Sequence, residues 1–242
     1  MCTVTYIPKN NNEFILTQNR DESPHRSAHQ LVKVDKNGKQ LLFPKDSGAG
    51  GTWISAADSN QLVSILNGAF AKHKHRPPYR KSRGIMALDF FDFSNAGQFF
   101  TSYNFEGIEP FTMLIYDDGK LFDFRWDDQY KIIEELDVSQ PYLWASATLY
   151  TKEAKMKRKI WFEEWRKDRT DFSQSAILDF HLTAGDGDPE NDLVMNRSNK
   201  VRTTSITSIN KSNSSFEMYF SDLMTGKVLV DKINLKAIPK LD

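Results

Sequence analysis

The stretch MCTVTYIPKNNNEFILTQNRDE, residues 1–22, decides the fold. Two runs of β-prone residues, 2–7 and 14–18, flank a connection rich in proline and asparagine, which predicts a β-hairpin. In an antiparallel hairpin the end of the second strand returns to the start of the first. We therefore expect Cys2 to lie beside Arg20 and Asp21.

Cys2 is the only cysteine of the chain. An initiator methionine followed by so small a residue is normally removed, which would leave Cys2 with a free α-amine. An α-amine titrates near ~7.7–8.0 and a thiol near ~8.5, so the amine is a suitable base for its own side chain. Arg20 would favour the thiolate, and Asp21 would hold the ammonium group. The alternative is an inert thiol at a frayed terminus, with Asp21 in a turn or cap.

Four short blocks resemble a known family. Asn19-Arg20-Asp21-Glu22 is similar to the signature of the NRDE family, which includes the transport and Golgi organisation 2 proteins, and the opening Met-Cys also fits. Residues 50–54, 64–67 and 82–84 resemble its later blocks in order and spacing. The resemblance covers the first 84 residues and thins beyond them.

The NRDE family is grouped with N-terminal-nucleophile hydrolases of the choloylglycine hydrolase and penicillin V acylase kind. The resemblance thus implies a layered αββα fold with Cys2 as the nucleophile. It also implies that Asn67 donates to the oxyanion, that Arg202 lies near the nucleophile, and that the substrate is bound by Asn19, Thr52 and Trp53.

The residues themselves leave other roles open for these positions. Asn67 precedes a glycine and is equally typical of a turn, and Trp53 is equally typical of a core. Arg202 is as typical of a salt-bridged strand edge. The glycine-rich segment 47–52 is either a plain connector or a loop that faces a ligand.

One segment departs from the related hydrolases. They carry a second oxyanion-binding asparagine, and the best local alignment places it at Ser146-Ala147-Thr148. Alanine cannot donate that hydrogen bond. Either Ser146 or Thr148 replaces it, or the oxyanion hole is incomplete, or the protein binds without catalysing. Those hydrolases also place their arginine slightly before the Asp21 equivalent, where this chain has Gln18.

Composition excludes several classes of protein. Basic and acidic residues number 32 each, so the net charge gives no reason to expect nucleic acid as a partner. A single cysteine excludes an internal disulfide framework, and no apolar run reaches the length of a membrane span. We expect one domain over residues 1–242, a cytoplasmic location, and no metal or organic cofactor. Oligomers are possible, and the partner would be a small-molecule substrate or ligand.

The remaining segments favour an α+β fold. Hairpins are predicted over 31–43 and 111–125, single strands over 61–66 and 142–145, and a meander over 201–233. Helices are predicted over 85–91, 149–167 and 172–182, and a weak helix or a turn over 98–105. In the helix over 149–167, Leu149, Met156, Ile160 and Trp161 suggest the buried stripe. The acidic loop 185–192 fails the calcium-loop pattern.

Two functions follow from these residues. The first is an N-terminal cysteine hydrolase that cleaves a linear C–N amide bond of a small acyl amide, with Cys2, Arg20, Asp21, Asn67 and Arg202 at its site. The second is a protein of the same fold that binds a hydrophobic, acyl-type or haem-type ligand without turnover. A thiol redox sensor is disfavoured, because the chain has no resolving cysteine.

Overall fold

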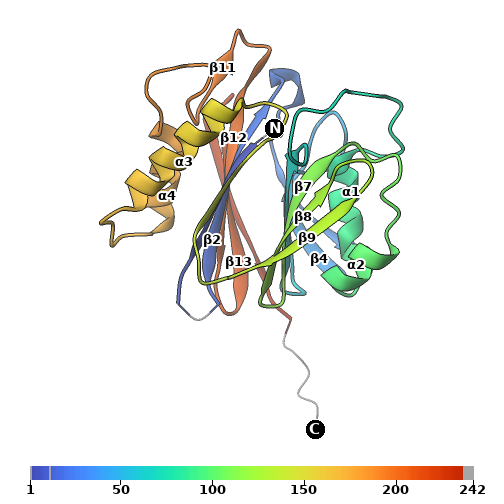
Figure 1. Ribbon diagram of the computed structural model, residues 1–242. Coiled ribbons are helices and arrows are strands. Elements are labelled where there is room, and N and C mark those ends of the chain that lie inside the picture. The colour runs from blue at the N-terminus through green and yellow to red at the C-terminus, as the bar shows by residue number, and fades with distance from the viewer. Residues whose placement is uncertain (1, 11, 237–242) are drawn as a thin grey trace.

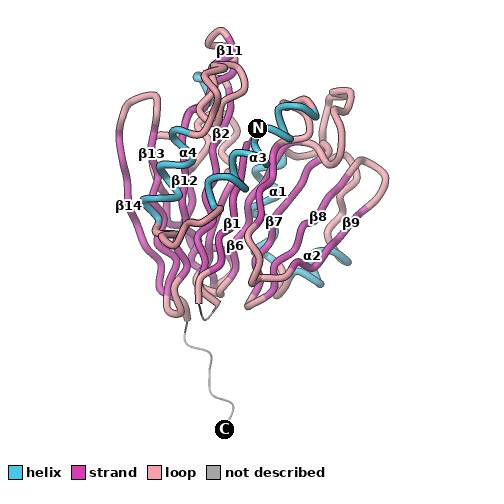
Figure 2. The backbone as a smooth tube through the Cα atoms, turned by 60° about the vertical axis from the view of Figure 1, so that its left-hand side comes forward, coloured by secondary structure: helices cyan, strands magenta, loops and turns pink. Residues whose placement is uncertain are grey.

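The chain folds into two antiparallel sheets packed face to face, with helices on both outer surfaces (Figure 1). The computed structural model describes residues 2–10 and 12–236. Within them the first sheet has the order β10-β1-β2-β12-β13-β14, with β11 paired to β12, and the second runs from β3 to β9 in sequence order. The tube view shows the two sheets diverging around a shared interior (Figure 2). The predicted αββα layering is confirmed.

The strands have the following bounds. The first sheet contains β1 (Cys2–Pro8), β2 (Phe14–Glu22), β10 (Tyr142–Ala145), β11 (Asn196–Arg197), β12 (Val201–Lys211), β13 (Ser215–Asp222) and β14 (Lys227–Asn234). The second contains β3 (Leu31–Lys36), β4 (Lys39–Pro44), β5 (Ile54–Ala57), β6 (Gln61–Asn67), β7 (Phe111–Asp117), β8 (Lys120–Trp126) and β9 (Lys131–Leu136). The predicted hairpins and meander are therefore present. Strand β9 was not predicted, because its largely exposed sequence lacks a clear apolar alternation.

The N-terminal hairpin lies inside the first sheet and is buried on both faces. Strand β1 pairs with β2 on one side and β10 on the other, and β2 pairs in turn with β12. Cys2, Val4 and Tyr6 face the core between the sheets, whereas Ile7 belongs to the core under the outer helices. Successive side chains of a strand point to opposite faces, so both faces of this hairpin are available to build a site.

Within residues 2–10 and 12–236, four α-helices cover the outer surfaces. In Figure 1, α3 (Lys152–Arg166) and α4 (Gln174–Thr183) lie against the first sheet, and α1 (Arg83–Asp89) and α2 (Ala96–Ser102) against the second. Short 3-10 turns occupy Pro24–Arg26 and Phe90–Asp92. Each α-helix begins after a Ser, Thr or Asn whose side chain accepts a hydrogen bond from the backbone N–H three residues on. These N-caps fix where the helices start.

The predicted buried stripe of α3 is wrong at Met156 and Ile160, whereas Trp161 is partly buried and packs against the core under the outer helices. Met156 and Ile160 are 58% and 46% exposed, and the buried residues of the helix are Ala154, Arg158 and Phe162. These three recur at i, i+4 and i+8, so a helical period is present but carries an arginine at its centre. A pattern of apolar residues cannot reveal this face, because it depends on tertiary partners that satisfy a buried cation.

Within the described part of the chain, none of the helices combines the length and the apolar composition that crossing a membrane requires.

Candidate active site

A cavity of about 360 Å³ opens where the beginning of β1 meets the end of β2. Its walls come from both sheets, from the loop before β5 and from the segment that leads into α1. Residues that line it include Cys2, Arg20, Asp46, Thr52, Trp53 and Asn67. Five of these six were proposed from the sequence, and the fold brings them to one place. Asp46 is the addition.

Cys2 is at the base of this cavity and is only 1% exposed. Burial raises the pKa of its thiol above the ordinary value, and the charge of Asp21 acts in the same direction. A hydrogen bond with Gln18 and the charge of Arg20 oppose this rise in pKa without cancelling it. The thiol therefore requires a nearby base to become a nucleophile at neutral pH.

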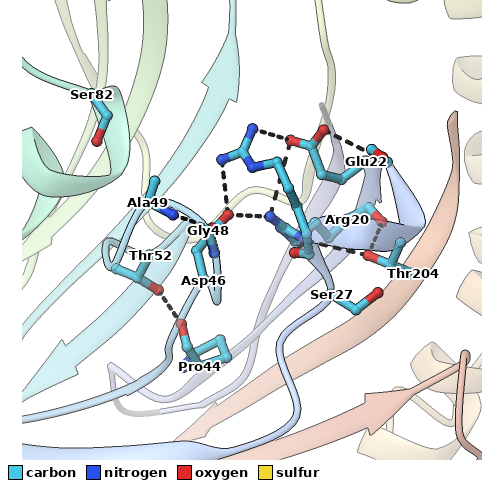
Figure 3. A network of polar contacts seen from close by, with 12 residues as sticks. Arg20, Glu22, Ser27, Pro44, Asp46, Gly48, Ala49, Thr52, Ser82 and Thr204 are labelled. Atoms are coloured by element: carbon cyan, nitrogen blue, oxygen red, sulfur yellow. Dashed lines mark hydrogen bonds and ion pairs between the residues drawn. The ribbon is translucent and has the colours of Figure 1, made fainter. Parts of the chain in front are cut away.

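Arg20 lies directly opposite Cys2 in the β1–β2 ladder, as predicted. Its guanidinium pairs with the Asp46 carboxylate (Figure 3). The guanidinium carbon also lies 4.3 Å from the centroid of the Trp53 ring. Arg20 donates a hydrogen bond of 2.7 Å to the backbone carbonyl of Arg26. Its charge is thus largely compensated by Asp46, and its effect on the thiol is small.

Asp46 is the centre of the polar network in Figure 3, and no motif of the sequence predicted this role. One carboxylate oxygen contacts Arg20 and Arg26, and the other accepts the backbone N–H groups of Gly48 and Ala49 at 2.9 and 2.8 Å. Partial burial alone would raise the pKa of Asp46, but the Ala49 amide and the two arginines hold it below its ordinary value. The carboxylate joins the glycine-rich loop to β2.

The glycine-rich loop also packs tightly against the start of α1. A Cβ atom on Gly51 would lie 2.5 Å from the backbone carbonyl carbon of Gly84, far closer than real contacts allow. Gly51 and Gly84 therefore permit a backbone approach that no other residue pair would. This contact forms one wall of the cavity, so the loop faces the site.

Thr52 and Trp53 both reach the cavity, although neither is exposed. The Thr52 hydroxyl contacts the backbone carbonyls of Pro44 and Ile54 at 2.9 and 2.8 Å, which occupies its single donor hydrogen. Trp53 is 6% exposed and belongs to the core between the sheets. Both predicted positions of Trp53, in the core and beside the pocket, thus hold at once.

Asp21 points to the opposite face of β2, toward the helices. Its carboxylate accepts hydrogen bonds from the hydroxyls of Tyr150 and Thr203, the latter at 2.6 Å. Burial raises the pKa of Asp21 above its ordinary value of 3.8, while Arg158 and these two hydroxyls act against the rise. Tyr150 and Arg158 were not identified from the sequence.

Asn19 and Arg202 are placed away from the cavity walls. The Asn19 amide donates to the backbone carbonyls of His181 and Leu193 at 3.0 and 2.8 Å, so it joins β2 to the helical layer. Arg202 lies opposite Glu22 in the backbone ladder between β12 and β2, and it is not among the residues that line the cavity. Its neighbour Thr203, rather than Arg202 itself, contacts Asp21.

Asn67 ends β6 at the cavity, and its side-chain amide makes no hydrogen bond within residues 2–10 and 12–236. The amide is therefore free to donate to a bound group. Its backbone carbonyl accepts the Ser146 hydroxyl at 2.9 Å, and Ser146 in turn contacts the Thr148 hydroxyl at 3.3 Å. Ser146 thus supports Asn67 from behind, and none of residues 146–148 lines the cavity.

The architecture and the position of this cavity define an N-terminal-nucleophile hydrolase fold. The chain is similar to two variants of the conjugated bile acid hydrolase of Clostridium perfringens, with a TM-score of 0.55 for both, 9% and 8% identity, and full coverage of each chain. It is also similar to the Caenorhabditis elegans ortholog of N-acylethanolamine-hydrolyzing acid amidase, with a TM-score of 0.51 and 12% identity over 86% of this chain and 92% of that one.

Residues 1–170 match the family described as Transport and Golgi organisation 2, and the chain belongs to that family. No curated protein matches the chain. The predicted family and fold are therefore confirmed, whereas identities near 10% carry no information on the substrate.

Proposed function

We propose that this protein is an N-terminal cysteine hydrolase that cleaves linear C–N amide bonds of small acyl-amide substrates. The observation that supports this most directly is the meeting of Cys2 and Asn67 at one cavity between the sheets. A nucleophile and an unoccupied amide donor at the same cavity are the minimum that acyl transfer requires.

The reaction begins when the thiol proton of Cys2 passes to the free α-amine of the same residue. The sulfur then attacks the amide carbonyl, and the side-chain amide of Asn67 donates to the oxyanion of the tetrahedral intermediate. The ammonium returns the proton to the departing nitrogen, which leaves as an amine. Water attacks the thioester with the α-amine as base, and this step restores the thiol and releases a carboxylic acid.

This mechanism requires the removal of Met1, which lies outside the described residues. Burial raises the pKa of the Cys2 thiol, so the surroundings do not favour the thiolate. The α-amine of the same residue would take up the thiol proton instead. Asp21 would orient the resulting ammonium, because its carboxylate has remaining acceptor sites beyond its two hydroxyl partners.

The alternative of a binding protein rests on residues 146–148, which supply no second amide to the cavity. A hydrophobic or haem-type ligand would, however, meet ionic side chains such as Arg20, Asp46 and Arg83 at the cavity wall. These charges are paired, Arg20 with Asp46 and Arg83 with Glu109, but an apolar ligand over them would remove both pairs from water, and that desolvation is costly. The lining thus favours a small polar substrate and turnover over storage of an apolar ligand.

The first experiment is the intact mass of purified protein before and after a brief pulse of iodoacetamide near neutral pH. Because the chain has one cysteine, a single added mass reports on Cys2 alone. We expect Met1 to be absent and Cys2 to react faster than free cysteine. A screen of acyl amides should then yield turnover that Cys2→Ala abolishes. A retained Met1, or a thiol no faster than free cysteine, would contradict the proposal and favour the binding protein.

A further inference from the structure

Arg158 is a fully buried cation on the inner face of α3. The terminal nitrogen Nη2 donates to the backbone carbonyls of Asn191 and Asp192 at 2.9 and 2.8 Å, and Nη1 donates to the hydroxyl of Thr3 on β1. Among the residues that the structure describes, no carboxylate lies within 4.0 Å of it. A buried arginine without an ion pair is rare and requires compensation from further away.

Asp21 is the matching buried anion, also without an ion pair in the described ranges. Tyr150 lies between these two charges. The guanidinium carbon of Arg158 is 3.7 Å from the centroid of the Tyr150 ring, and the hydroxyl of the same ring donates to the Asp21 carboxylate. Cation, ring and carboxylate thus form one chain of contacts, called the Arg158–Tyr150–Asp21 chain below, that extends from α3 to the end of β2.

We propose that Tyr150 and Arg158 are positioning residues that keep Asp21 ionised, so that its carboxylate can hold the α-amine of Cys2 during acyl transfer. This inference rests on the proposed function. It assigns a role to two residues that lie outside the cavity and touch no substrate.

The electrostatics of the Arg158–Tyr150–Asp21 chain support this role. A cation over the face of the ring withdraws electron density, which strengthens the hydroxyl as a donor to the carboxylate. Burial raises the pKa of Asp21, and Arg158 is the strongest influence that opposes the rise, ahead of Thr203 and Tyr150. Burial and the adjacent Asp21 raise the pKa of Tyr150 well above 10.0, so the phenol keeps its proton and remains a donor.

The other ionisable groups around the Arg158–Tyr150–Asp21 chain do not supply the positive charge that keeps Asp21 ionised. His181 faces it from α4, but burial and Arg158 lower its pKa to about 3, so it is neutral at physiological pH. Cys2 faces it from β1 and adds negative charge when ionised. Arg197 lies 5.9 Å from the Tyr150 ring, and its guanidinium is engaged with the backbone carbonyls of Leu149 and Glu190. Arg197 is therefore a matched control.

The test measures the rate of Cys2 alkylation by iodoacetamide from pH 4 to pH 9, read by intact mass. When Asp21 takes up a proton at low pH, it no longer holds the ammonium group that favours the thiolate. The alkylation rate should therefore fall on the acidic side of the pH profile, and this falling part is called the acidic limb below. We expect Arg158→Met to move this acidic limb upward by about one pH unit. Well below the limb, that shift means alkylation slower by about tenfold.

Arg158→Lys retains the charge and should recover part of the shift. Tyr150→Phe removes the hydroxyl and should move the limb in the same direction by a smaller amount. Arg197→Met should leave the limb unchanged. Circular dichroism establishes that each variant is folded, and if Arg158→Met does not fold, Tyr150→Phe decides. A purely structural role would lower stability without moving the pH profile.

Two results would overturn the inference. One is an unshifted limb in folded Tyr150→Phe and Arg158→Met proteins, and the other is an equal shift in Arg197→Met. If the unchanged protein already retains Met1 or alkylates no faster than free cysteine, the proposed function fails together with this inference. A fast thiol with unshifted variants overturns the inference alone.

Discussion

Cys2 and Arg20 face each other across the β1–β2 ladder, yet the Arg20 guanidinium pairs with Asp46 rather than serving the thiol alone. The arginine contributes only the last of several influences on the pKa of Cys2, behind burial. Its main role is to connect the end of β2 to the glycine-rich loop. The integrity of the cavity therefore depends on Asp46 as much as on the residues next to the nucleophile.

Replacement of the Asp46 carboxylate should destabilise the protein. Asp46→Asn leaves the buried Arg20 with only the more distant Glu22 carboxylate, at 4.0 Å, and we expect a loss of about 3 kcal/mol in the free energy of unfolding in urea. Glu135→Gln is the control, because it breaks an ion pair with Lys120 that is more than half exposed on both sides and should change stability by less than about 1 kcal/mol. Equal effects of the two substitutions would contradict this role of Asp46.

Asp46 also gives a pH dependence of known sign. Its pKa in the folded protein is below the ordinary 3.8, so it stabilises the fold above that pH. This stabilisation is lost as the pH falls through the folded value, because the unfolded chain takes up the proton first. The difference in stability between the unchanged protein and Asp46→Asn should thus shrink below pH 4. Urea denaturation at pH 7, 5 and 3 measures it.

His181 should dominate the pH dependence of the free energy of unfolding between pH 6 and 4. It is fully buried between Thr5 and Asn19, and burial, followed by the charge of Arg158, lowers its pKa from 6.5 to about 3. Above pH 6.5 the histidine is neutral in both states, and below it only the unfolded chain gains a proton. The free energy of unfolding should therefore fall by about 1.4 kcal/mol per pH unit between pH 6 and 4.

His181→Gln should remove most of that slope while it lowers stability at pH 7. His25→Gln is the control, since His25 is exposed in the 3-10 turn after β2. A slope that persists in His181→Gln would show that other groups cause it.

Asn67→Ala should impair acyl transfer and leave the fold intact. We expect acetylation of Cys2 by p-nitrophenyl acetate, followed by intact mass, to slow by about 10²-fold, because a donor to the oxyanion is lost. The backbone ladder of β6 with β7 does not depend on this side chain, so the thermal midpoint should change little. Asn210→Ala, at the end of β12 where the strand pairs with Ile15, should acetylate at the unchanged rate.

Gly51→Ala should disturb the wall of the cavity. The added methyl group would lie 2.5 Å from the Gly84 backbone, so the loop and α1 must separate, at a cost of about 1–3 kcal/mol. Gly48→Ala in the same loop is the matched control, because its methyl group would meet its nearest neighbours at 3.4 Å or more. Thermal denaturation and the rate of Cys2 alkylation should both change for Gly51→Ala only.

The sequence predicted the elements that depend on local chemistry. The first hairpin, the Asp117-Asp118-Gly119 turn between β7 and β8, and the C-terminal meander follow from alternation and turn residues, which act over a few positions. Short motifs likewise indicated the family and the N-terminal-nucleophile fold. The buried face of α3 could not be predicted in this way, because Arg158 is buried only through partners on β1, in the loop after β10 and near residue 191.

The sequence by itself determined the hairpin register that brings Cys2 opposite Arg20, since alternation and a short connection allow few other pairings. Only the tertiary structure decided which charges act on which groups. Asp46 and Tyr150 are separated by 26 and 129 residues from their partners Arg20 and Asp21. Contacts at such separations arise when the two sheets and the outer helices pack together. Because a buried charge is costly without a partner, it pairs with the polar groups that this packing places beside it.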